Sequence, residues 1–85
     1  MPSISMFFGI IIYMYFDAHK PPHFHAQYQG YKATFDFDGE LLEGSMPNTQ
    51  RKLISAWAVI HRRELVANWT LAEDKQPLYS IEPLR

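Results

Sequence analysis

The feature that most constrains the fold is a strict alternation of side chains that runs from His23 to Asp38 and is interrupted at Gln29–Gly30. A period of two places alternate residues on opposite faces of a β-strand. Gln29–Gly30 suits a hairpin turn, and Asp38–Gly39 is among the strongest two-residue hairpin signals. The pattern therefore predicts two antiparallel strands with a third to follow. The predicted faces of the second strand are Tyr31, Ala33, Phe35 and Phe37 against Lys32, Thr34, Asp36 and Asp38.

Three further apolar segments extend this meander. The first two are rich in Ile, Phe, Met and Tyr, which favour strands over helices. Residues 17–22 contain two prolines and are predicted to form a loop. We expect an α+β protein with an antiparallel meander of four to five strands within residues 3–44. The additional strands are predicted at residues 3–7, 10–16 and 40–44.

The second half predicts one long helix packed across the sheet, from about Pro47 to Glu73, because no breaker occurs before Pro77. On a helical wheel, an apolar sector is expected to cover the sheet. Glu64, Asn68 and His61 fall inside that sector, at about 20°, 60° and 80° from Leu53. Such buried polar groups need hydrogen-bond partners, since each costs about 1–3 kcal/mol when unsatisfied. The apolar residues of the sector are Ile60, Leu53, Leu71, Trp57, Ile54 and Leu65.

Length and composition bound the class of protein. A chain of 85 residues is expected to form a single domain (1–85), with an extended tail at residues 74–85 lying over it. The absence of cysteine excludes disulfides and thiolate metal sites and fits a reducing cytoplasm. The apolar run at 4–16 is shorter than the roughly 20 residues of a membrane helix, and it lacks the features of a signal peptide. We therefore expect a cytoplasmic protein.

His19, His23 and His25 form the sharpest constellation of chemically active side chains. His23 and His25 share a strand face, and His19 reaches the same point from a loop that two prolines stiffen. Three histidine ligands with an open position are typical of catalytic Zn²⁺, Fe²⁺ or Mn²⁺ sites, so we predict a possible divalent metal here. Asp17 is a further candidate, as a ligand or as the partner of an imidazole. A metal-free cleft and purely structural histidines remain as alternatives.

His61 and Glu64 form a second constellation, on the predicted helix. In the functional interpretation Glu64 orients His61 as a general base, and His23 and His25 complete the catalytic set. In the structural alternative the pair pins the helix on the sheet. If His61 faced the strand histidines, all four residues would form one two-sided site.

Basic and aromatic residues provide a third hypothesis, a surface for RNA or DNA. The net charge of −1 gives no global attraction for nucleic acid, so a solvated helix face is the alternative. The residues are Lys20, Lys32, Arg51, Lys52, Arg62 and Arg63, with Tyr13, Tyr15, Tyr28 and Tyr31 available for stacking.

The segments P-S-I-S-M-F-F-G-I-I-I-Y-M-Y-F-D, H-K-P-P-H-F-H-A and H-R-R-E-L resemble a family of small bacterial proteins catalogued as domain of unknown function 4160. The resemblance implies short cytoplasmic proteins, often encoded beside another small protein, some with suspected toxin–antitoxin roles. It implies no established activity. Tyr13 departs from the family, whose members usually carry Arg there. The motif positions map to His19, Pro21, Pro22, His23, His25, His61, Arg62, Glu64 and Leu65.

Two functions follow as expectations. The first is a protein- or nucleic-acid-binding module of a toxin–antitoxin-like pair, with a partner protein encoded by a neighbouring gene. The second is a metal- or histidine-dependent hydrolase, with RNA as its candidate substrate. An exposed sheet edge and a high aromatic content also favour a homodimer.

Overall fold

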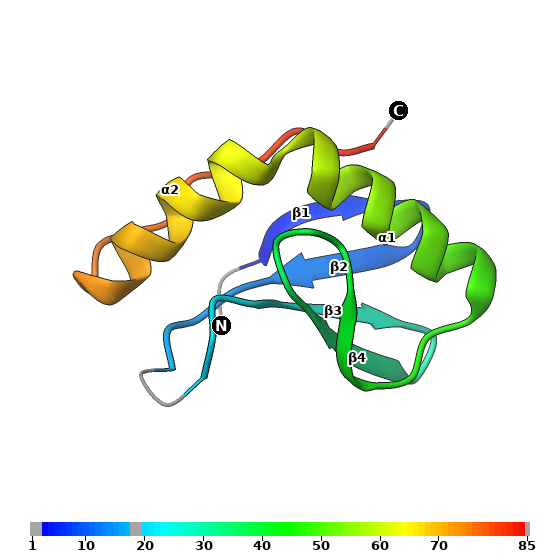
Figure 1. Cartoon of the computed structure of the whole chain (residues 1–85). Helices are drawn as coiled ribbons and strands as arrows, with labels where there is room; N and C mark the ends of the chain where they lie inside the picture. The colour runs from blue at the N-terminus through cyan, green and yellow to red at the C-terminus, as the bar shows by residue number, and fades with distance from the viewer. Residues whose placement is uncertain (1–2, 18–19, 85) are drawn as a thin grey trace.

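The computed structural model describes residues 3–17 and 20–84. Five strands form one antiparallel sheet in the order β1-β2-β3-β4-β5, and two helices lie across one of its faces (Figure 1). This confirms the α+β fold and the five-stranded meander. The strands are β1 (Ser3–Phe7), β2 (Ile10–Tyr13), β3 (Phe24–Tyr28), β4 (Tyr31–Phe35) and β5 (Leu41–Gly44).

Two strands end three residues earlier than the sequence predicts. β2 ends at Tyr13 instead of residue 16, because Tyr13 makes the last pairing of β2 with both neighbouring strands. β4 ends at Phe35 because Asp36 turns the chain: its Oδ1 accepts hydrogen bonds from the amides of Asp38 (2.9 Å) and Glu40 (3.0 Å). The β4–β5 connection is therefore an Asp-stabilised loop rather than a two-residue Asp38–Gly39 turn.

The second half contains two helices, so the prediction of one long helix is wrong in this respect. α1 (Asn48–Ile60) and α2 (Arg62–Glu73) meet at His61, whose φ of −107° and ψ of 24° are not helical. Hydrogen bonding continues across the junction, because the amides of His61 and Leu65 donate to the carbonyls of Trp57 and His61, both at 3.0 Å. The break contains neither Gly nor Pro, the usual sequence signals for it.

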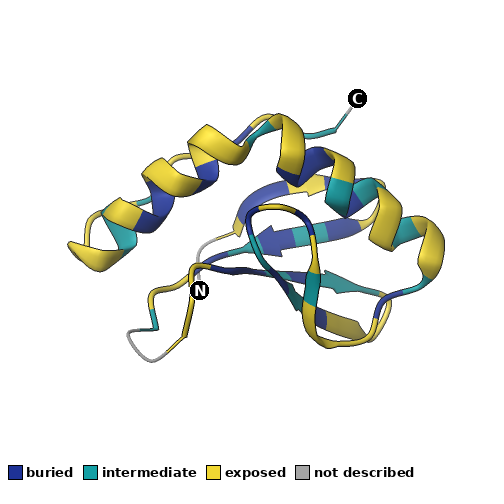
Figure 2. Cartoon of the chain, in the orientation of Figure 1, coloured by how far each residue is buried: buried dark blue, intermediate teal, exposed yellow. Residues whose placement is uncertain are grey.

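The buried face of the helices also differs from the predicted one. Ile60, predicted to cover the sheet, is 64% exposed, and Trp69, outside the predicted sector, is buried. The observed face is rotated by about 50° from the predicted one on the helical wheel. Figure 2 shows the buried positions along the sides of both helices that face the sheet. They are Ile54, Trp57 and Ala58 on α1, and Leu65, Asn68 and Trp69 on α2.

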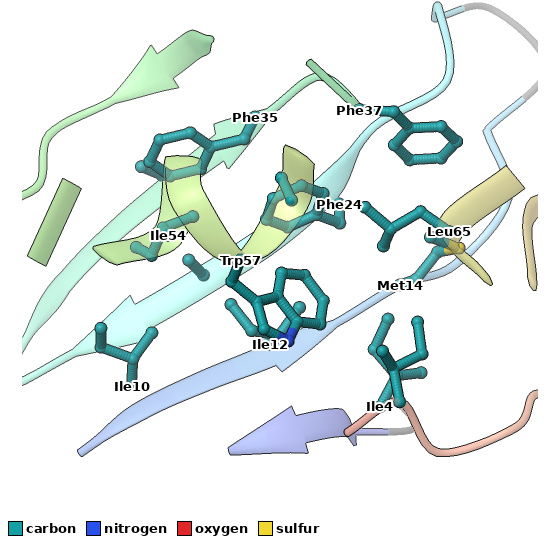
Figure 3. Close-up of a cluster of buried hydrophobic side chains, with 14 of the residues drawn as sticks. Ile4, Ile10, Ile12, Met14, Phe24, Phe35, Phe37, Ile54, Trp57 and Leu65 are labelled. Carbon is teal, nitrogen blue, oxygen red and sulfur yellow. The ribbon is translucent and has the colours of Figure 1, made fainter. Parts of the chain in front are cut away.

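The core lies between the helices and one face of the sheet. Phe24 packs against Phe35 with ring centroids 5.7 Å apart and meets the Trp57 ring edge-on at 5.6 Å (Figure 3). Ile12 and Leu65 complete this layer, both fully buried. Aromatic side chains bury a large apolar area each, which offsets the small buried surface of a domain of this size.

Residues 76–84 form neither helix nor strand. They run back along α2 toward β1 (Figure 1), where the Ile81 amide donates to the Ile4 carbonyl at 2.7 Å. Within the residues described, neither helix has the length and apolar character needed to cross a bilayer.

Candidate functional site

His25 lies on the sheet face that points away from the helices. Its neighbours in β3, Phe24 and Ala26, are fully buried under the helices, so the side chain of His25 must point to the other side. The register places His25 between Tyr13 of β2 and Thr34 of β4. We call this side the open face; it also carries Gln27, Lys32 and Glu43.

Two tyrosines stack on the His25 ring. The centroid of Tyr15 lies 4.5 Å from that of His25 with the planes 12° apart, and the centroid of Tyr13 lies at 5.2 Å and 6°. Cross-strand pairing brings Tyr13 to this position, and Tyr15 follows two residues later. Tyr15 is 40% exposed, so the stack is accessible to solvent.

The His25 ring, on which the two tyrosines stack, has one ring nitrogen without a hydrogen-bond partner among the described residues. This nitrogen, Nε2, is buried. Burial lowers the pKa of His25 below its ordinary 6.5, and the positive charges of His23 and Lys20 lower it further, while Glu43 opposes them. The neutral imidazole is therefore the favoured form at neutral pH.

His23 joins the open face to the helix layer at one end of the sheet. His23 is buried, with 3% of its surface exposed. Its ring centroid lies 5.0 Å from that of His25 and 5.5 Å from that of Trp69 on α2. Its Nδ1 donates a hydrogen bond to the Pro21 carbonyl at 2.8 Å. This bond fixes the proton on Nδ1, so in the neutral ring Nε2 carries the lone pair.

Two shallow hollows flank these histidines and share Thr34 and Glu43. The first has a volume of about 180 Å³ and the second about 310 Å³. An ion pair between Lys20 Nζ and Glu43 Oε1 (3.4 Å) ties the loop before β3 to strand β5 beside the first hollow. The first hollow is lined by Lys20, Pro21, His23, Thr34, Leu42 and Glu43, and the second by Tyr13, Tyr15, His25, Lys32, Ala33, Thr34, Glu43 and Gly44.

The predicted metal ligands are only partly observable. His19 lies outside the described residues, so its place relative to His23 and His25 is not established. Among residues 3–17 and 20–84, no three His, Asp or Glu side chains are grouped so as to hold a metal ion.

His61 and Glu64 lie on the opposite side of the sheet from His25. His61 Nδ1 donates to Glu64 Oε1 at 2.7 Å, and the His61 ring lies 5.7 Å from that of Trp57, which packs on the covered face. The structure thus brings His23 together with His25 and His61 together with Glu64. It does not bring the two pairs together, so the two-sided site is not formed.

Neither Asn68 nor the helical basic residues lie at the site around His25. Asn68 is 1% exposed and bonds the backbone of Tyr79 in the tail rather than any histidine. Lys20 and Lys32 lie beside the open face, whereas the helical basic residues do not, and Arg62 pairs with Asp38 at 2.9 Å. The predicted nucleic-acid surface is therefore divided. The helical residues are Arg51, Lys52, Arg62 and Arg63.

Thr34, Leu42 and Glu43 line the site without having been predicted to do so. Thr34 and Glu43 are cross-strand partners of one another, and Thr34 is the partner of His25. Pairing outward from the tight Gln29–Gly30 turn predicts the contact of His25 with Thr34. The contact of Thr34 with Glu43 cannot be predicted in this way, because the register between β4 and β5 is irregular.

Comparison with protein families gives a match to this chain. A family model described as "Domain of unknown function (DUF4160)" matches residues 9–70, which include the open face, His23, His25, His61 and Asn68. No curated protein and no solved structure matches the chain.

Proposed function

We propose a function for this chain, which belongs to the Domain of unknown function (DUF4160) family. Because that description names no activity, the proposal is argued from the side chains of this chain. The match confirms the resemblance found in the sequence. The chain is a nucleic-acid-binding module, which takes a single strand of RNA on the open face of its sheet. Its compartment is the cytoplasm, and its biological context is a toxin–antitoxin-like pair.

The stack of Tyr15, His25 and Tyr13 is the observation that carries this proposal. Aromatic rings on a solvent-facing sheet provide platforms for unpaired bases, each worth about 1–3 kcal/mol of binding free energy. Lys20 and Lys32 stand beside the hollows and are placed to neutralise phosphates. A single strand is favoured over a duplex because only unpaired bases offer a free face to a tyrosine.

The charge distribution makes the proposal quantitative. Two lysines on this face and a net charge of −1 imply that stacking contributes more than phosphate contacts. For single strands, each neutralised phosphate contributes about −0.7 to the slope of log K against log salt. Phosphate contacts of both lysines, which for Lys20 replace its ion pair with Glu43, therefore predict a slope of about −1.4.

The test measures fluorescence anisotropy of a labelled octaribonucleotide and of the corresponding duplex. Tyr15→Ala should weaken binding of the single strand about tenfold or more. Tyr79→Ala is the matched control, since Tyr79 is 72% exposed on the tail and away from the open face. Lys32→Ala should flatten the salt slope, whereas Lys52→Ala on α1 should not. Equal affinity for the single strand and the duplex, or an unchanged affinity of the Tyr15→Ala variant for the single strand, would refute the proposal.

The toxin–antitoxin context has its own test. The resemblance supports a partner protein encoded beside this chain. Co-expression with the neighbouring gene product and capture of the untagged chain should give a stoichiometric complex. A clean negative at native protein levels would remove this part of the proposal and leave RNA binding unaffected.

A histidine-dependent hydrolase is the second candidate, favoured by the contact between His23 and His25. A histidine that is neutral at pH 7 can accept a proton, and His23 is the neighbouring group that can donate or hold one. A divalent metal bound by His19, His23 and His25 is the alternative form of this candidate. His61 and Glu64, on the other side of the sheet, are assigned no role in a shared step.

Cleavage of the same labelled RNA tests this candidate directly. Activity should fall at least a hundredfold in His25→Asn and persist in His61→Asn. Metal content of protein purified without a histidine tag should be stoichiometric and lost in His23→Ala if a metal is involved. Intact RNA together with absent metal would exclude both forms.

A further inference from the structure

The backbone of the C-terminal tail, residues 76–84, is hydrogen-bonded to α1, α2 and β1, and we call the surface of these elements that the tail covers the groove. Asn68 Nδ2 donates to the Tyr79 carbonyl at 2.8 Å, and the Tyr79 amide donates to Asn68 Oδ1 at 2.9 Å. Trp57 Nε1 donates to the Glu82 carbonyl at 2.8 Å. Together with the bond from the Ile81 amide to the Ile4 carbonyl, these hydrogen bonds attach residues 79–82 to α1, α2 and β1.

Apolar anchors of the tail occur at every third residue. Ile81 is 4% exposed, and Leu78 and Leu84 pack against the core on either side of it. A spacing of three is the period of a polyproline II helix, and Pro77 and Pro83 suit that conformation. A polyproline II segment has no internal hydrogen bonds, so its backbone groups are available to the groove. The tail is therefore bound much as a separate extended peptide would be.

The hinge that connects the tail to α2 is short and strained. Lys75 has φ of 56°, a left-handed conformation that residues other than glycine rarely adopt. The turn is closed by hydrogen bonds from the Lys75 amide to Ala72 (3.1 Å) and from the Gln76 amide to Leu71 (2.8 Å). Extending the hinge would relieve the strain at Lys75, and short strained hinges favour exchange of segments between chains.

We propose that two copies of this chain exchange their tails, so that residues 76–84 of each copy fill the groove of the other. Every tail contact of the monomer is then made again between copies, with Asn68 bonded to Tyr79 of the second copy. Only the hinge at residues 74–76 changes conformation. Exchange of an identical element costs little for this reason.

Variants of Lys75 test the proposal through the dimer dissociation constant, measured by sedimentation of the full chain. Lys75→Gly removes the strain of the closed hinge and should raise that constant about fivefold or more. Lys75→Val increases the strain while retaining the amide, and should lower it by a similar factor. Gln29→Gly is the matched control, because Gln29 also has a positive φ, of 43°, but lies in the β3–β4 turn. It should leave the constant unchanged.

Isotope-filtered NMR distinguishes tail exchange from any other dimer. In a mixture of ¹⁵N-labelled and unlabelled copies, the Tyr79 amide proton should show contacts to the Asn68 side chain of the other copy. Three results would overturn the proposal: a monomer at all concentrations in the wild type and in Lys75→Val, a dimer that does not respond to Lys75, or contacts within copies only.

Discussion

At the scale of single residues, the buried amide of Asn68 and the buried Nε2 atom of the half-buried His25 have opposite hydrogen-bonding situations. Asn68 has both ends of its amide satisfied by the backbone of Tyr79. His25 has a buried Nε2 without a partner among the described residues, in the middle of the tyrosine stack. An unsatisfied buried group costs about 1–3 kcal/mol, so Asn68 stabilises the fold, while His25 carries a cost consistent with a binding role.

Asn68→Leu should lower the free energy of unfolding by about 1–3 kcal/mol, because the amide and carbonyl of Tyr79 lose their partners. Urea denaturation measures the change. Thr70→Ala on the same helix is the control, since its hydroxyl only bonds the Val66 carbonyl on an exposed surface, at 3.3 Å. The control should stay within about 0.5 kcal/mol of wild type. Equal effects of the two substitutions would contradict this account of Asn68.

His25 should make stability depend on pH. Its pKa is lower in the folded chain than the ordinary 6.5, so the unfolded chain binds the proton more strongly. The stability from neutral His25 is complete above about pH 6.5 and is lost as the pH falls below it. His25→Phe keeps a ring for the stack but cannot titrate. Between pH 7.5 and pH 5, urea denaturation should show a larger loss for wild type than for His25→Phe, and parallel losses would refute the assignment.

At the scale of elements, the β4–β5 loop is attached directly to α1. Ser55 Oγ donates to the Gly39 carbonyl at 2.7 Å, and a Cβ added at Gly39 would lie 2.9 Å from Ser55 Cα. A glycine at position 39 therefore has two roles: it lets the two backbones approach closely, and it adopts a φ of 87°, which other residues rarely do. This contact positions the hairpin whose strands carry Thr34 and Glu43 across the open face.

Two glycine substitutions separate the close approach from the backbone conformation. Gly30 has a φ of 84° but nothing within 4 Å of an added Cβ. Gly30→Ala should cost about 1 kcal/mol of unfolding free energy from left-handed strain alone. Gly39→Ala should cost about 1–3 kcal/mol more, since the loop must move from α1. Thermal or urea denaturation compares them, and equal costs would mean that the contact with Ser55 is unimportant.

Predictability from sequence also differs between elements. The tight turn at Gln29–Gly30 fixes the pairing of His25 with Thr34, and alternation alone assigns Phe24 and His25 to opposite faces. The break at His61 has no local sequence signal, because neither Gly nor Pro occurs there. The apolar residues of the helices centre the predicted face about 50° from the observed one, so the helical wheel places Ile60 inside although it is exposed. The site at His25 was predictable as a strand face, but its separation from His61 was not.

At the scale of the whole molecule, the sheet and the tail differ in how they are attached. β3 is the central strand, paired on both sides, and Ala26 within it is fully buried. The tail is attached by individual hydrogen bonds and by apolar anchors at every third residue. Regions with few contacts open at lower free energies than the core.

Hydrogen exchange should therefore resolve two opening reactions. The Ala26 amide should exchange only through global unfolding, with a free energy equal to that from denaturation. The Ile81 amide, bonded to the Ile4 carbonyl, should exchange at a lower free energy through detachment of the tail. Low concentrations of denaturant should accelerate Ala26 more steeply than Ile81, because detachment exposes less surface than unfolding. Identical free energies and denaturant slopes for the two amides, measured by NMR, would show that the tail opens only when the whole domain unfolds.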